Sequence, residues 1–68
     1  MEIQRRLAAR VKALRRQKGW SQEELAHQAG VHRTFVSQIE RATRIATIVS
    51  AEKFAKALGV KPGELLDE

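Results

Sequence analysis

Residues 21–41 read SQEELAHQAGVHRTFVSQIER and carry two short helix patterns separated by a glycine. Ser21 followed by Glu24 is a capping box, in which the serine hydroxyl and the glutamate carboxylate satisfy the free amides at a helix start. Gly30 permits the positive φ of a sharp turn, and a second helix is expected to begin near His32. The stretch therefore predicts a helix over residues 22–29, a turn of a few residues, and a second helix behind it.

The second of these helices divides into an apolar side and a polar side. At about 100° per residue, Val36 and Ile39 fall on the apolar side, and Val31 supports them from the turn. Glu40 falls near the same side, where an unpaired carboxylate is strongly unfavourable, and Arg15 on the flank of an earlier apolar stripe is its expected partner. The opposite side carries side chains that can read hydrogen-bonding patterns: Arg33, Thr34, Ser37, Gln38 and Arg41.

Helical patterns continue on both sides of this stretch. Residues 3–18 repeat apolar side chains at helical spacing and end at Gly19, which suits the left-handed residue after a helix. Thr47 is the expected N-cap of a helix that ends at Gly59, and Pro62 begins a short fifth helix. The side chains expected to face the core from the longer two segments are Ile3, Leu7, Val11, Leu14, Ile48, Ala51, Phe54, Ala55 and Leu58. Because the only strand-like run is residues 45–49, the sequence predicts one all-α domain over residues 1–68.

Composition narrows the class of function. The 68 residues carry a net charge of +5, and residues 1–18 hold seven basic residues and one acidic residue. Concentrated basic charge is typical of a protein that binds a polyanion, although a small soluble protein can carry it too. The chain has no cysteine and only two isolated histidines, so no disulfide, metal site or cofactor is expected.

The parts of an enzyme or of a membrane protein are also missing from the sequence. No serine has an adjacent histidine and carboxylate, and no glycine-rich loop is present to cradle a phosphate, so catalysis is not expected. No run approaches the ~20 apolar residues that span a bilayer, and the N-terminus lacks the apolar core of a secretion signal. We therefore expect a cytoplasmic, non-enzymatic protein without a membrane partner.

The spacing of the two central helices is that of a helix-turn-helix. Three pieces of sequence, RVKALRRQKGWSQEELA, AGVHRTFVSQIER and KFAKALGV, make residues 10–66 resemble the DNA-binding domain of the phage-repressor and Cro family, also called the xenobiotic-response-element family. Within that family, HRTFVSQIER followed by TRIATI resembles the small controller proteins of restriction-modification systems. The resemblance implies a lambda-repressor-like five-helix domain whose third helix lies in the major groove of double-stranded DNA.

The resemblance also implies which side chains meet the bases. By position in the motif, Arg33 is expected to pair with guanine and Gln38 with adenine, while the methyl group of Thr34 touches thymine. The full set of expected base contacts is Arg33, Thr34, Ser37 and Gln38. An ordinary solvated helix face is the alternative interpretation for each of them.

Other side chains are expected at the phosphates. Gln22, at the start of the first central helix, matches the family position that holds a phosphate near the positive end of the helix dipole. The further phosphate candidates are His32, Phe35, Arg41, Thr43 and Arg44. The expected pair of Arg15 and Glu40 sits where related repressors have a buried bridge. Trp20 is predicted to pack in the core, and His27 to be exposed without a site.

After the third helix the chain departs from its family. The family usually has glycine at this point and then a loop ending in Asn-Pro, whereas Ala42, Ile45 and Ala46 occupy these places. Alanine in a left-handed conformation costs about 1 kcal/mol relative to glycine. We therefore expect the third helix to run further or to end differently.

Two branched apolar residues of this region have no assigned place in the core. Ile45 and Val49 are either partly buried in the loop or form, with one of Leu65 and Leu66, a contact patch for a second subunit. Together, the family resemblance and this contact patch predict a transcription regulator that binds DNA as a homodimer. A restriction-modification controller, an antitoxin with a toxin partner, and an interaction module that keeps the fold without reading DNA remain the alternatives.

Overall fold

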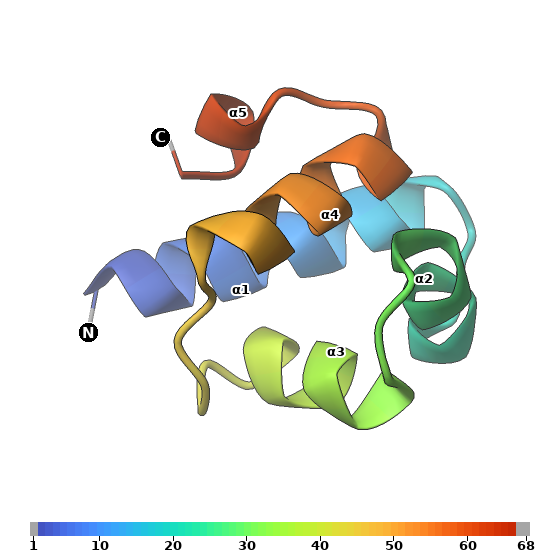
Figure 1. Cartoon of the computed structure of the whole chain (residues 1–68), viewed down its shortest axis with the longest axis horizontal. Coiled ribbons are helices and arrows are strands. Elements are labelled where there is room, and N and C mark those ends of the chain that lie inside the picture. The colour runs from blue at the N-terminus through green and yellow to red at the C-terminus, as the bar shows by residue number, and fades with distance from the viewer. Residues whose placement is uncertain (1, 67–68) are drawn as a thin grey trace.

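Five helices make up the fold (Figure 1). The computed structural model describes residues 2–66 of the chain. The helices are α1 (Glu2–Gln17), α2 (Gln22–Ala29), α3 (Arg33–Glu40), α4 (Ile48–Leu58) and α5 (Pro62–Leu66). Their number and order confirm the predicted all-α, five-helix fold, and within residues 2–66 the strand-like run at 45–49 forms no strand. None of these five helices is long and apolar enough to cross a membrane.

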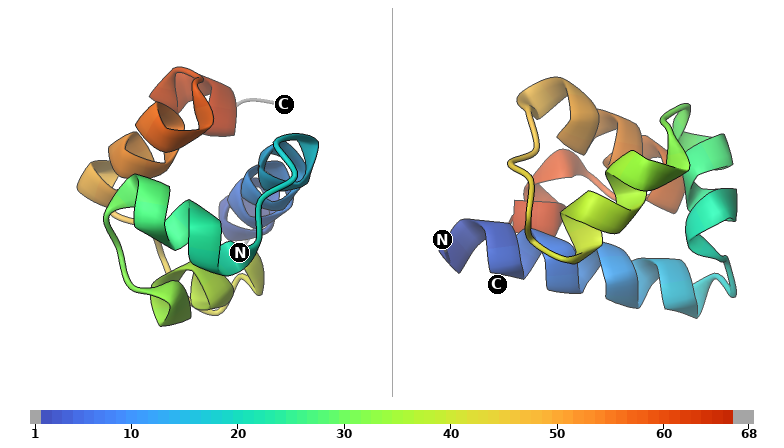
Figure 2. Two further views of the ribbon diagram at one scale, coloured as in Figure 1. Left: turned by 90° about the vertical axis from the view of Figure 1, so that its right-hand side faces the viewer. Right: turned by 90° about the horizontal axis from the view of Figure 1, so that it is seen from below.

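The third helix lies at the edge of the domain. α2 packs against α3 and α4, while α5 packs against α1 and α4. In Figure 1, α3 runs along the lower edge below α1 and α4. Seen from below in Figure 2, α3 lies in front of the other helices. One side of α3 therefore faces away from the rest of the molecule.

Short-range hydrogen bonds fix both ends of α2. The hydroxyl of Ser21 accepts a hydrogen bond from the amide of Glu24 at 3.0 Å, as the first half of a capping box requires. The second half of the predicted box differs, because the carboxylate of Glu24 accepts from the side-chain amide of Gln28 at 2.7 Å, one turn further along the helix. At the other end, Gly30 takes a φ of +69°, which confirms the predicted sharp turn. His32 then serves as the N-cap of α3.

One core draws on all five helices. Its largest fully buried side chains are Val11, Leu25, Val36, Ile39, Phe54 and Leu65. Trp20 packs against this cluster and His27 is exposed, which confirms the predicted packing of Trp20 and the predicted exposure of His27. Because α3 contributes two of these buried side chains, the hydrophobic effect holds it in place from its inner side.

Two side chains predicted to lie in the core are at the surface instead. Ile48 is 82% exposed and Ile3 is 49% exposed. At about 100° per residue, Ile48 lies about 90° from the centre of the buried arc of α4, and Ser50 occupies the buried side of that turn. Ser50 is satisfied there because its hydroxyl donates to the carbonyl of Thr47 at 3.0 Å. Ile3 lies in the first turn of α1, which extends past α3 and α4 (Figure 1).

Contrary to the prediction, α3 keeps the ending that favours glycine although alanine stands there. The helix ends at Glu40, and Ala42 takes a φ of +57°. The amide of Ala42 donates to the carbonyl of Ile39 at 3.0 Å, and that of Thr43 donates to the carbonyl of Gln38 at 3.0 Å. These bonds satisfy carbonyls at the helix end, so the left-handed conformation is retained despite the strain of an alanine side chain.

Replacing Ala42 by glycine is expected to raise the free energy of unfolding by about 1 kcal/mol, because the strain at positive φ disappears. Urea unfolding followed by circular dichroism measures the change. Gly30→Ala is the reverse control, since a Cβ at Gly30 meets no atom within 4 Å and its φ is +69°. It should lower the free energy by a similar amount. A neutral or destabilising Ala42→Gly would contradict the assigned strain.

Candidate nucleic-acid interface

The outward side of α3 brings together the four predicted base contacts. They share a position on the exposed or partly exposed half of the helix: Arg33, Thr34, Ser37 and Gln38. On the inner half, Val36 is 0% and Ile39 is 1% exposed. The buried half anchors the helix, which leaves the polar half available to a ligand that approaches from outside.

An ion pair fixes the C-terminal end of α3 to α1. The Nε of Arg15 donates to Oε2 of Glu40 at 2.7 Å, and its Nη2 donates to Oε1 at 3.1 Å. Arg15 Nη1 donates to the carbonyl of Trp20 at 2.7 Å. The side chain of Glu40 is 2% exposed and that of Arg15 is 12% exposed. The contact predicted from the sequence is therefore present, and its two-pronged geometry restricts how α3 can rotate on the domain.

Gln22 joins this network from the first position of α2. Its Nε2 donates to Oε1 of Glu40 at 3.1 Å, a contact that the sequence pattern did not reveal. An amide nitrogen has two hydrogens, so the second can still be donated outward. Because the first amides of a helix have no partner within the helix, the start of α2 gathers donors that suit an anion. The network holds Gln22 at that helix start.

Phe35 differs from its predicted role at a phosphate. Its ring stacks on that of Phe54, with centroids 5.9 Å apart and an angle of 4° between the planes. Its amide donates to the carbonyl of His32 at 3.0 Å. On a helical wheel Phe35 falls about 70° from the centre of the buried arc, on the opposite flank from Glu40. Helical spacing could therefore have assigned Phe35 to the core boundary, where the structure places it.

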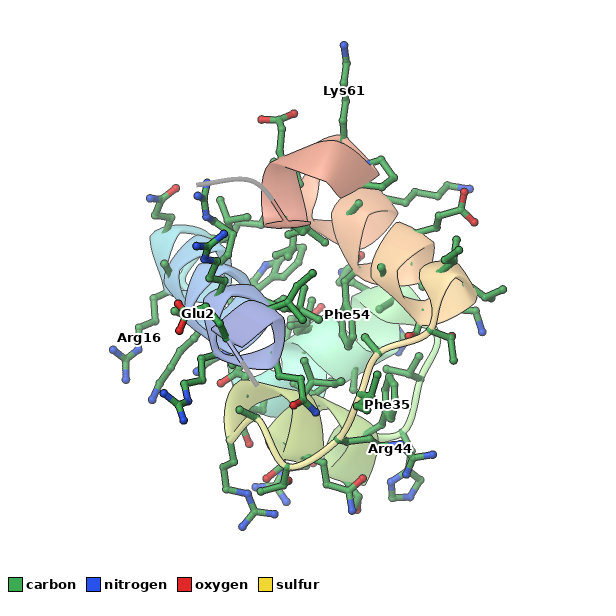
Figure 3. All side chains as sticks on the ribbon, turned by 90° about the vertical axis from the view of Figure 1, so that its left-hand side faces the viewer. Glu2, Arg16, Phe35, Arg44, Phe54 and Lys61 are labelled. Carbon is green, nitrogen blue, oxygen red and sulfur yellow. The ribbon has the colours of Figure 1, made fainter. Side chains whose placement is uncertain are left out.

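The residues after α3 fold back onto Gln38. Arg44 Nη1 donates to Oε1 of Gln38 at 3.1 Å, and the hydroxyl of Thr43 donates to the carbonyl of Gln38 at 3.1 Å. The Arg44 guanidinium lies 5.0 Å from the centre of the Phe35 ring, within the range of a cation–π contact. Figure 3 shows Phe54, Phe35 and Arg44 in succession from the core to the edge. Sequence reasoning treated Gln38 and Arg44 separately and missed their contact.

Positive charge surrounds the outward side of α3. Arg33, Arg41 and Arg44 are exposed, whereas Glu40, the only acidic residue within 31–44, is paired with Arg15. His32 and Thr43 are exposed as well. The Nδ1 of His32 accepts from the amide of Thr34 at 3.1 Å, so the tautomer that caps α3 carries its hydrogen on Nε2. This surface attracts an anionic ligand and offers it donors.

A separate apolar patch lies where α4 begins. We call Ile3, Ile45, Ile48 and Val49 the apolar patch, and they are 49%, 64%, 82% and 62% exposed. Three of them border a groove of about 240 Å³ whose floor includes Leu7 and Ala51. Two predicted members of a subunit contact, Ile45 and Val49, are therefore both exposed, and Ile45 borders the groove.

Leu65 does not belong to this patch, contrary to the prediction. It is 0% exposed and forms part of the core between α5 and its neighbours. A residue buried in this way is not available to a second subunit. The side chain of Leu66, the other predicted contact on α5, lies outside the described part of the chain.

Comparison with known proteins agrees with this arrangement. The family model described as helix-turn-helix, HTH_3, matches residues 11–65. The control protein C.BamHI of Bacillus amyloliquefaciens is 53% identical over 47 residues, which are 69% of this chain and 58% of that protein. A Neisseria meningitidis protein described as a hypothetical transcription factor is 48% identical over 60 residues, 88% of this chain. The chain spans 58% and 57% of the length of these two relatives.

Solved structures show the same fold. The restriction-modification controller protein C.AhdI of Aeromonas hydrophila superposes with a TM-score of 0.90 at 37% identity, over 96% of this chain and 98% of that one. The helices of this chain follow the same arrangement, and the matching family model covers the second half of α1, all of α2, α3 and α4, and α5 except its last residue. The chain belongs to the HTH_3 helix-turn-helix family.

Proposed function

We propose that the protein is a cytoplasmic transcriptional regulator that binds double-stranded DNA sequence-specifically, with α3 in the major groove. The observation that carries this proposal is the division of α3 between a core side and an outward polar side. The major groove is about 12 Å wide and admits one α-helix. α3 lies at the edge of the domain, in front of the other helices when the molecule is seen from below (Figure 2), so it is the helix that this face presents to a groove. Relatives described as control proteins and as a transcription factor support the same function.

In this proposal the outward side chains of α3 meet the base edges. Arg33 pairs with the O6 and N7 of guanine, because its planar guanidinium donates two parallel hydrogen bonds. Thr34 and Ser37 have short side chains, so each can touch only a base edge that lies close to the backbone of α3. The base contacts are Arg33, Thr34, Ser37 and Gln38. The buried ion pair of Arg15 and Glu40 supports this readout by restricting the rotation of α3.

Phosphates supply most of the affinity. Hydrogen-bond donors lie on both sides of α3. They come from the start of α2, from the turn before α3 and from the loop after α3. The proposed phosphate contacts are Gln22, His32, Arg41 and Arg44. Thr43, which the sequence also suggested, already donates both its amide and its hydroxyl hydrogen to the carbonyl of Gln38 and is left out. Affinity for any duplex should fall steeply with salt, because each neutralised phosphate releases a counterion.

The apolar patch is proposed to hold a second copy of the chain. Ile3, Ile45 and Ile48 border one groove, Val49 follows Ile48 in α4, and all four are exposed. Water solvates such branched side chains poorly, and a two-fold axis lets the same patch face itself. A dimer of this fold presents two α3 helices to half-sites about 34 Å apart. The contacts come from Ile3, Ile45, Ile48 and Val49 instead of Leu65.

A titration of random-sequence duplex at low and at moderate salt tests the proposal of DNA binding. Salt-sensitive binding is expected, and its absence would favour an interaction module that does not bind DNA. Selection of bound sites from a random DNA pool then reports specificity. Recovered sites should contain two inverted half-sites about one helical turn apart.

Arg33→Ala is expected to lower the affinity for a selected site by roughly 1–3 kcal/mol and to relax specificity at one base pair. Arg33→Lys is the matched control, since lysine keeps the charge but not the two-pronged geometry. It should retain the affinity for random DNA while losing much of the preference for guanine. Equal losses on selected and random DNA for Arg33→Ala would contradict base readout by Arg33.

A narrower proposal is that the protein controls a restriction-modification system. The observation that favours it is the 53% identity to C.BamHI across residues that include the helix-turn-helix. The selected DNA site should then occur upstream of genes for a restriction enzyme and its methyltransferase. A reporter fused to that promoter should respond to the protein and lose the response with Arg33→Ala.

A further inference from the structure

The contact between Gln38 and Arg44 bears on which base Gln38 reads. Glutamine ordinarily reads adenine through both ends of its amide: Oε1 accepts from N6 and Nε2 donates to N7. In this structure Oε1 already accepts from Arg44 Nη1 at 3.1 Å. Since a guanidinium has donors and no acceptor, the amide end that faces Arg44 must be the oxygen. The amide orientation is therefore fixed by chemistry.

Arg44 is itself held in place on its other side. Its guanidinium lies 5.0 Å from the centre of the Phe35 ring, and that ring stacks at 5.9 Å on Phe54, which is 0% exposed. Thr43, the residue before Arg44, bonds to the carbonyl of Gln38 through both its amide and its hydroxyl. Three hydrogen bonds therefore join the loop to Gln38, two from Thr43 and one from Arg44. The stacked rings of Phe35 and Phe54 support the position of the Arg44 guanidinium (Figure 3).

From these contacts we infer that Arg44 sets the base preference of Gln38 and turns it from adenine to guanine. The inference rests on the proposed function, since it assumes that α3 enters the major groove. With Oε1 bound to a cation, the amide presents its Nε2 hydrogens outward as donors. A carbonyl oxygen has a second lone pair, but the amino group of adenine would have to approach it beside the positive guanidinium, where its own hydrogens are repelled.

Guanine suits this pair of side chains better than adenine. Its major-groove edge offers two acceptors, N7 and O6, and no donor. Nε2 of Gln38 can donate to one of them while the nearby guanidinium adds an attractive positive charge. The two residues thus act as one donor surface, in which Gln38 touches the base and Arg44 is the positioning residue.

Replacing Arg44 by methionine tests this role. Methionine keeps an unbranched apolar chain over Phe35 but removes both the donor and the charge. The base pair that Gln38 reads is first located as the position whose preference is lost in Gln38→Ala. At that position the wild-type protein is expected to prefer guanine, and Arg44→Met should lower the ratio of guanine to adenine affinity by at least about five-fold.

Arg41→Met is the matched control. Arg41 is exposed directly after α3, the helix that carries Gln38. Its replacement removes the same charge as Arg44→Met and should therefore weaken binding to guanine and adenine sites alike. A second readout needs no DNA: the side-chain amide signals of Gln38 in an NMR spectrum should shift in Arg44→Met and stay in place in Arg41→Met.

Two outcomes would overturn the inference: a preference for adenine in the wild-type protein, or an Arg44→Met variant whose base preference matches that of Arg41→Met. Failure of the proposed function looks different, because no variant would then select any sequence from the random pool.

Discussion

Arg15→Met is expected to lower the free energy of unfolding by about 3–5 kcal/mol. The reason is the environment of its partner, since the carboxylate of Glu40 is 2% exposed and would keep only the hydrogen bond from Gln22. A domain of this size has a total stability of roughly 3–10 kcal/mol, so the variant is expected to be partly or wholly unfolded at room temperature.

A double-mutant cycle separates the ion pair from the packing around it. Glu40→Met should cost less than Arg15→Met, because Arg15 is the more exposed partner and keeps its bond to the carbonyl of Trp20. The combined variant should recover much of the loss, since it leaves no buried charge without a partner. Arg16→Met, at an exposed neighbouring position, controls for the loss of one positive charge. Strictly additive losses in the cycle would contradict a direct coupling of Arg15 and Glu40.

Ile48→Asp is expected to convert the proposed dimer into a folded monomer and to lower affinity for a two-half-site duplex by about 100-fold or more. Ile48 is 82% exposed, so the substitution leaves the core of the monomer intact. It would place two carboxylates near the two-fold axis of the proposed dimer. The loss of affinity follows because a dimer binds its second half-site at a high effective concentration, whereas a monomer does not.

Sedimentation measures the first effect and DNA titration the second. Ile48→Lys is the matched variant, because it also places like charges in the apolar patch but adds attraction to DNA. Both variants should sediment as monomers and lose the preference for two half-sites over one. Wild-type protein that remains monomeric at high micromolar concentration would contradict the dimer itself. Retained two-site preference in both variants would place the subunit contact elsewhere on the surface.

The pattern of residues within each segment was sufficient to predict most of the fold. Ser21 marks a helix start through its hydroxyl, whereas Gly30 and Gly59 mark helix ends through their backbone conformation. Both effects act within a few residues, and the structure has its helix ends there. The pair of Arg15 and Glu40 was predictable because each falls near an apolar stripe and a buried charge requires a partner. For the site, the same periodicity placed Arg33 and Gln38 on the outward side of α3.

What the sequence did not reveal depends on contacts between segments. The first turns of α1 and α4 have the periodicity of buried helices, but within residues 2–66 no other helix covers Ile3 or Ile48. Periodicity alone does not report where the partner of a helix ends. The left-handed conformation of Ala42 follows from hydrogen bonds to the end of α3, which outweigh a local preference of about 1 kcal/mol. The bond from Arg44 to Gln38 depends on that loop conformation, so no spacing rule predicts it.

The two-sided construction of α3 has a consequence for engineering. Val36, Ile39 and Glu40 supply the contacts that hold the helix, and none of them belongs to the proposed base contacts. Positions 33, 34, 37 and 38 can therefore be randomised together in a library while most members still fold. Position 44 belongs in the same library, because Arg44 would otherwise contact a new side chain at position 38 in the way that suits glutamine. Such a five-position library lets new operator preferences be selected without first stabilising the scaffold.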